Sequence, residues 1–194
     1  MIPTPGLWYK WFRANFLAFA LSYALLAIVD QAVDAFGAHG HALGFVAHVI
    51  SMLLGGILIG VLQIHALGAR FKKASWIAIS AIVYPLSFII GEVLGGLPYG
   101  LLTSFVLFGI LSGIWQSLFL RRQTLRANWW ILISTLGFAL AGLIATAIIL
   151  TAFALGGRAI LDTLSPIPAF TIIGAVGGGV AGTITGFGLA KLLQ

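Results

Sequence analysis

The chain has 194 residues, of which 61% are hydrophobic and only 7% are charged, and it contains no cysteine. A soluble domain carries about 25% charged residues, so this composition excludes a soluble enzyme and a disordered chain. The lack of cysteine excludes a disulfide-rich secreted scaffold, an iron–sulfur protein and a thiolate zinc site. A lipid bilayer is the solvent that suits such a chain, and one crossing takes about 20 residues. We therefore predict a multi-pass membrane protein with a single transmembrane domain over residues 1–194.

The net charge of +6 comes from short basic clusters that separate apolar segments. These clusters are Lys10 with Arg13, then Arg70, Lys72 and Lys73, then Arg121, Arg122 and Arg126. Such a distribution is typical of topology signals and of contacts with lipid headgroups. The partner that it predicts is membrane lipid, and it argues against nucleic acid.

Six apolar segments follow one another, at about 11–36, 42–67, 75–97, 100–120, 129–155 and 167–193. Each is long enough to span roughly 30 Å of hydrocarbon as a helix, and none has the strict alternation of an outer-membrane barrel strand. The first segment is too long for the apolar core of a signal peptide, so we expect a retained helix. The predicted fold is all-α, with six transmembrane helices.

The charges also predict an orientation. With the N-terminus inside, nine of the ten basic residues fall on the inner side, and only Arg158 falls outside. The four acids, Asp30, Asp34, Glu92 and Asp162, fall at or near the outer face. Because lysine and arginine accumulate in cytoplasmic loops, both termini are predicted to be cytoplasmic. The expected location is the bacterial inner membrane or an internal photosynthetic membrane.

An internal repeat emerges when the sequence is shifted by 53 positions. The residues Gly56, Gly60, Gln63, Leu67, Ala74 and Trp76 then align with Gly109, Gly113, Gln116, Leu120, Ala127 and Trp129. A weaker third copy contains Gly178, Gly182, Thr185 and Leu189. Trp8 and Trp11 are candidates for a remnant of the same tryptophan feature ahead of the first segment. The pattern predicts three helical hairpins of the same orientation.

Residues at i, i+4 and i+7 share one face of a helix. Two glycines on that face let a neighbouring backbone approach closely, and the amide that follows can hydrogen-bond across the contact. The tryptophan at the loop edge is expected at the headgroup level, with its indole N–H in water. Two interpretations stay open: packing of the hairpins around a pseudo-threefold centre, or exposure of Gln63 and Gln116 to a conduction path or a partner subunit.

The second copy continues with Leu120, Arg121 and Arg122, followed by the pair Trp129 and Trp130. This pattern resembles that of small multi-pass membrane proteins from photosynthetic and filamentous bacteria. The resemblance covers roughly positions 55–80, 105–140 and 174–193, and the first copy departs from it with Leu-Gly-Ala at 67–69 and a single tryptophan. It implies a membrane-embedded helical fold and supplies no activity or ligand.

Ionisable residues at membrane depth are candidate sites because they are costly to place there. Asp30, His48 and Glu92 are expected at similar depth near the outer face, where they could form an outward-facing pocket or a proton-linked site. The alternative is that two of these side chains form a buried, hydrogen-bonded pair whose role is to fix helix packing. A metal site from Asp30, Asp34, His39 and His41 is a further option from ligand type alone.

The sequence leaves the cofactor open. His48 or His65 could each ligate a pigment or a haem. They lie about 25 Å apart along one helix, so they cannot share a centre. No nucleophile, zinc-protease or phosphate-loop pattern is present, which predicts a protein that is not an enzyme. The expected function is an accessory, scaffold or assembly subunit that binds other membrane-protein subunits. The alternative is a small-molecule carrier, such as the substrate-binding component of an uptake transporter.

Overall fold

The computed structural model describes residues 6–37, 42–68, 73–154 and 166–193. The elements in chain order are α1 (Leu7–Ala35), α2 (Ala42–Leu67), α3 (Lys73–Leu120), α4 (Trp129–Ala154) and α6 (Pro166–Leu192). They hold six spans that are long and apolar enough to cross a membrane, because α3 contains two of them, Ala74–Gly96 and Tyr99–Leu120. The predicted all-α architecture with six spans is confirmed, and the first helix begins four residues earlier than expected.

The two spans of α3 fold back on each other. A straight helix would separate Gly91 from Ser104 by about 20 Å, yet a Cβ atom added at Gly91 would collide with the backbone of Ser104. A Cβ at Gly95 would likewise lie 2.8 Å from the Cα of Gly100. The reversal falls at Gly96, whose φ of 57° is a left-handed conformation that glycine adopts without a steric penalty. We refer to Ala74–Gly96 and Tyr99–Leu120 as the first and second legs of α3.

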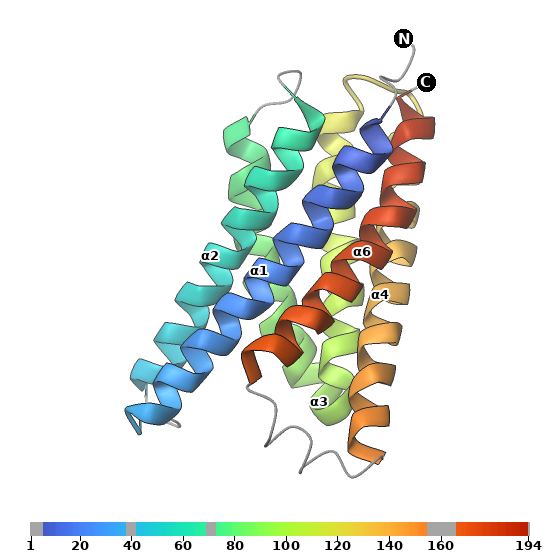
Figure 1. Ribbon diagram of the computed structural model, residues 1–194. Helices are drawn as coiled ribbons and strands as arrows, with labels where there is room; N and C mark the ends of the chain where they lie inside the picture. The colour runs from blue at the N-terminus through green and yellow to red at the C-terminus, as the bar shows by residue number, and fades with distance from the viewer. Residues whose placement is uncertain (1–5, 38–41, 69–72, 155–165, 194) are drawn as a thin grey trace.

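The spans form a closed ring, in which α1 contacts α2 and α6, α3 contacts α2 and α4, and α4 contacts α6. Helix α1 begins and α6 ends at the same end of the bundle (Figure 1). We call this the basic end, because it carries Lys10, Arg13, the 121–126 arginines and Lys191. Asp30, Asp34 and Glu92 lie toward the opposite end, which we call the acidic end.

Aromatic side chains fill the middle of the ring. Phe19 of α1 packs with Phe108 of the second leg of α3 at 5.7 Å and with Phe138 of α4 at 5.5 Å between ring centroids. Tyr84 of the first leg completes this cluster through Phe19 at 6.1 Å. All four rings are buried. Aromatic pairs at these separations add about 0.5–1.5 kcal/mol each beyond area burial, so the centre of the bundle is a packed core.

Candidate functional site

Asp30 and His48 form a polar pair near the acidic end. The Nε2 atom of His48 lies 3.1 Å from Oδ1 of Asp30, and its Nδ1 lies 2.8 Å from the carbonyl oxygen of Gly44. A carbonyl oxygen can only accept, so Nδ1 carries a hydrogen. The side chains are 26% and 40% exposed for His48 and Asp30, so this hydrogen-bonded pair is open to its surroundings.

Glu92 does not complete this pair as the sequence suggested. A Cβ atom added at Gly100 would lie 2.8 Å from the carboxyl carbon of Glu92, so the carboxyl group lies against the start of the second leg of α3, and the Glu92 side chain is exposed. Across the described ranges, no three histidine, aspartate or glutamate side chains gather closely enough to hold a metal ion. His39 and His41, which the metal hypothesis also used, lie outside the described residues.

A buried polar network occupies the interior toward the basic end. In each of three places, a buried indole N–H donates to a polar side chain on the adjoining span. The three bonds run from Trp11 Nε1 to Thr185 Oγ1 (2.9 Å), from Trp76 Nε1 to Gln63 Oε1 (3.0 Å) and from Trp130 Nε1 to Gln116 Oε1 (3.0 Å). All six side chains are buried. These distances are typical of well-formed hydrogen bonds.

Asn15 and Gln63 link the three bonds into one network. Gln63 Nε2 donates to Asn15 Oδ1 at 2.9 Å, and Asn15 Nδ2 donates to the carbonyl oxygen of Trp11 at 2.9 Å. Gln116 Nε2 approaches Gln63 Oε1 at 3.4 Å, a long and therefore weak contact. The members are indoles, amides and a hydroxyl, none of which titrates near neutral pH. The network can therefore hold helices together and contains no group that acts as an acid or a base near neutral pH.

Glycines bring the helices close enough for these bonds. A Cβ atom would lie 2.7 Å from the Cα of Ile77 at Gly60, 3.1 Å from the Cα of Ile131 at Gly113 and 3.2 Å from the Cα of Phe12 at Gly182. One turn earlier, a Cβ at Gly56, Gly109 or Gly178 would meet the backbone oxygen of Ser80, Ser134 or Asn15, respectively. Glycine thus removes the atom that would hold each pair of backbones apart. In each pair, the glycine helix faces the helix that supplies the tryptophan.

The expectation that the indole N–H lies in water is wrong for Trp76. Its side chain is 1% exposed, and its N–H is bonded to Gln63 instead of water. In the second copy, the buried indole belongs to Trp130, whereas Trp129, the residue aligned with Trp76, is 60% exposed. The segment between amide and indole is one residue longer in that copy, with separations of 14 and 13 residues. The alignment therefore pairs Trp76 with Trp129, whereas the residue that makes the equivalent hydrogen bond is Trp130.

Asn15 is the network member that the sequence analysis missed. It lies four residues after Trp11, as Ser80 lies four residues after Trp76 and as Ser134 lies four residues after Trp130. A polar residue at i+4 from each repeated tryptophan was the available signal, because these positions share a helix face. Asn15 alone in this series has an amide long enough to reach across to Gln63.

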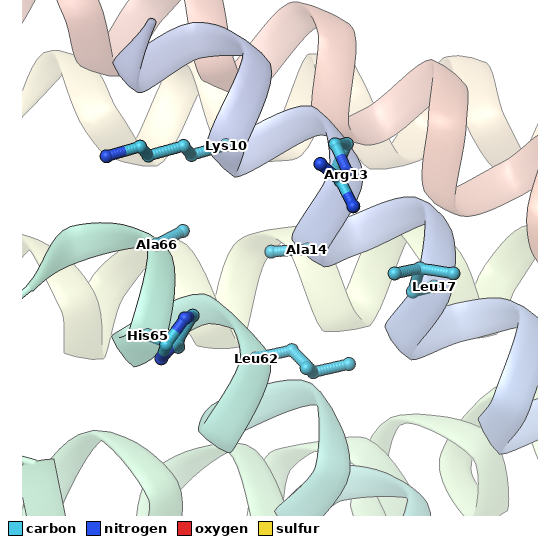
Figure 2. A pocket seen from close by; sticks show the side chains of 7 residues that line it. All are labelled: Lys10, Arg13, Ala14, Leu17, Leu62, His65 and Ala66. Carbon is cyan, nitrogen blue, oxygen red and sulfur yellow. The ribbon is translucent and has the colours of Figure 1, made fainter.

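His65 lies on the outside of the bundle, with its side chain exposed in the last turn of α2. It lines a groove that it shares with Lys10 and Arg13 of α1 (Figure 2). Its neighbours there are cations and apolar side chains. Comparison of the chain with protein-family models, curated proteins and solved structures found no match.

Proposed function

We propose that this protein is a non-catalytic integral membrane protein that serves as an accessory, scaffold or assembly subunit of a larger membrane complex. The observation that carries the proposal is the filling of the bundle interior. Aromatic rings occupy its middle, and a network of neutral side chains occupies the part toward the basic end. A carrier or an enzyme needs an internal polar cavity or a reactive group along that axis, and a helix-packing scaffold needs neither.

We further propose that the chain is built from three hairpin units, and that the third is formed by its two ends. The units pair α2 with the first leg of α3, the second leg of α3 with α4, and α6 with α1. Support comes from the three indole bonds and from the glycine contacts, which join the same pairs of spans. On this proposal, Thr185 and Trp11 correspond to Gln63 and Trp76.

The glycine motifs face the protein's own helices, so a partner subunit has to bind elsewhere. Gly60, Gly113 and Gly182 each abut a neighbouring span of the same chain. The surface left for a partner is the ring of large apolar side chains that point outward. One such residue on each span is, in order, Leu21, Ile57, Ile82, Leu118, Leu136 and Ile172, with exposed fractions between 40% and 61%.

Tryptophan substitution at these six outward positions tests the proposal. The full-length protein would be extracted from its native membrane in mild detergent, and the size and composition of its complex would be measured. We expect a stoichiometric complex that one or two adjacent substitutions disrupt, while the others leave it intact, because lipid accommodates a larger side chain and a packed interface does not. Ala18→Trp in the buried core is the control for a variant that fails to fold. A protein that behaves as a single chain in every variant contradicts the proposal.

The Asp30–His48 pair favours the second candidate, a small-molecule carrier driven by protons. Its two side chains approach to 3.1 Å and are partly exposed toward the acidic end of the bundle. In liposomes with a trapped pH-sensitive dye, a carrier would pass protons down an imposed gradient, and Asp30→Asn would stop the flux. Asp34→Asn, one turn away on the same helix, is the matched control. Proton flux that depends on Asp30 would establish the carrier and displace the subunit proposal.

We also propose that the basic end faces the cytoplasm, in the bacterial inner membrane or an internal photosynthetic membrane. The support is the separation of charge along the bundle. The arginines and lysines of the described ranges gather at the end where α1 begins, and Asp30, Asp34 and Glu92 gather toward the other. The positive-inside tendency then assigns the sides.

A further inference from the structure

A groove of about 330 Å³ opens on the outside of the bundle, between the start of α1 and the end of α2. Three basic side chains line it, Lys10, Arg13 and His65, together with apolar side chains that include Leu17 and Leu62. In Figure 2, the basic groups come from both helices, and the leucines lie farther along the two helices from Lys10. The groove is therefore amphipathic, with cations toward the end of the bundle and hydrocarbon below them.

Lys10 and Arg13 are the two permanent cations of the groove. Among the described residues, neither Lys10 nor Arg13 forms an ion pair with a carboxylate. The guanidinium of Arg13 instead lies 5.6 Å from the ring centroid of Tyr9, a cation–π contact that positions the charge without neutralising it. The next acid along α1 is Asp30, about 25 Å from Arg13 at 1.5 Å per residue. Within the described part of the chain, the positive charge of the groove is therefore not paired with a carboxylate.

The depth of these cations matches that of lipid phosphates. Helix α1 has 29 residues, or about 43 Å, which exceeds the roughly 30 Å of bilayer hydrocarbon by about 13 Å. If that excess is shared between the two ends, about 6 Å of helix at each end lies among the headgroups. Lys10 and Arg13 lie about 4 Å and 9 Å from the start of α1. Their long side chains can therefore reach the phosphate level by extending outward.

The size of the groove decides between classes of occupant. Pockets for small ligands have volumes of roughly 300–1,000 Å³, so the groove holds a headgroup and the beginning of an acyl chain, and a helix of another protein does not fit. We propose that this groove is a binding site for one anionic phospholipid of the membrane leaflet at the basic end. Lys10 and Arg13 bind the phosphate, His65 donates a hydrogen bond to it, and the acyl chain lies along Leu17 and Leu62.

Lipid binding by the full-length protein in mild detergent tests this proposal. Phosphatidylglycerol and phosphatidylcholine with identical acyl chains would be offered together, and the lipid retained per chain would be measured by native mass spectrometry. We expect one phosphatidylglycerol per chain, bound in preference to phosphatidylcholine. K10Q/R13Q should weaken phosphatidylglycerol binding by about 25-fold, from about fivefold for each cation removed.

Two further variants separate a specific site from general attraction. R122Q/R126Q removes the same charge from exposed positions at the basic end but outside the groove, and it should change binding less than twofold. Leu17→Trp keeps every charge and fills the groove at a side chain that is 42% exposed, so it should reduce retention while the protein stays folded. Equal binding of the two lipids, equal losses in the two double variants, or unchanged binding in Leu17→Trp would overturn the proposal. Displacement by millimolar glycerol phosphate would do the same, because it would identify a soluble phosphate as the ligand.

Discussion

Gln63→Leu tests the buried network most directly, because Gln63 contacts three other members of the network. They are Trp76, Asn15 and, through the long contact, Gln116. Gln63 Oε1 accepts from the indole of Trp76 at 3.0 Å, and its Nε2 donates to Asn15 at 2.9 Å. Leucine has a similar size and is apolar, so packing is largely kept while both bonds are lost. The indole N–H of Trp76 and the amide oxygen of Asn15 are then buried without those partners.

The size of the effect follows from these two losses. A buried polar group without its partner costs about 1–3 kcal/mol, which sums to about 2–6 kcal/mol for two groups. Hydrogen bonds between membrane helices average about 0.6 kcal/mol, because the separated helices find other partners in the membrane, so about 1 kcal/mol is the lower bound. We expect Gln63→Leu to destabilise the fold by about 2–4 kcal/mol. For a chain of this length, that loss lowers Tm by about 5–15 °C.

Thermal denaturation in mild detergent measures this loss, with size-exclusion chromatography reporting the fraction that survives each temperature. Gln116→Leu is the matched control, since it leaves one well-formed bond unmade, that of Trp130, plus a long contact of 3.4 Å. It should cost about half as much as Gln63→Leu. In the double variant Gln63→Leu/Trp76→Phe, the indole N–H that donated to Gln63 is also removed, so part of the lost stability should return. The reasoning fails if Gln63→Leu is as stable as the original protein, or if Gln116→Leu costs more.

Three other predictions follow from the packing and charge pattern. Gly60→Leu should sharply reduce the yield of folded protein, because its Cβ would lie 2.7 Å from the Cα of Ile77; unchanged yield and melting would contradict the close contact. Glu92→Gln should change the stability by less than about 0.5 kcal/mol. Glu92→Leu should be at least as stable as the original protein, because an ionisable side chain within a membrane span is costly and this one is exposed; a stable Gln variant that loses proton uptake would instead assign Glu92 to a site. Tags at both termini and in the loops at 68–75 and 121–128 should be protected from protease added outside the cell, and cleavage at either loop would reverse the proposed orientation.

The sequence alone determined the spans and the separation of charge along them. Hydropathy is a property of consecutive residues, and the bilayer imposes one length on every crossing. For that reason, the segments predicted at 42–67 and 129–155 agree to within one residue with Ala42–Leu67 and Trp129–Ala154. The break between the two legs of α3 could also be predicted from the sequence, because the glycines and the proline at 95–100 interrupt an otherwise apolar run.

Only the tertiary structure decided which side chains meet. Adjacent residues on a helix point about 100° apart, so one extra residue in a loop buries Trp130 and exposes Trp129. The same dependence on helix rotation brings His48 to Asp30 and turns Glu92 toward its own hairpin. Position along the chain predicts which residues lie toward the same end of the bundle, whereas direction around each helix axis depends on how all the spans pack together.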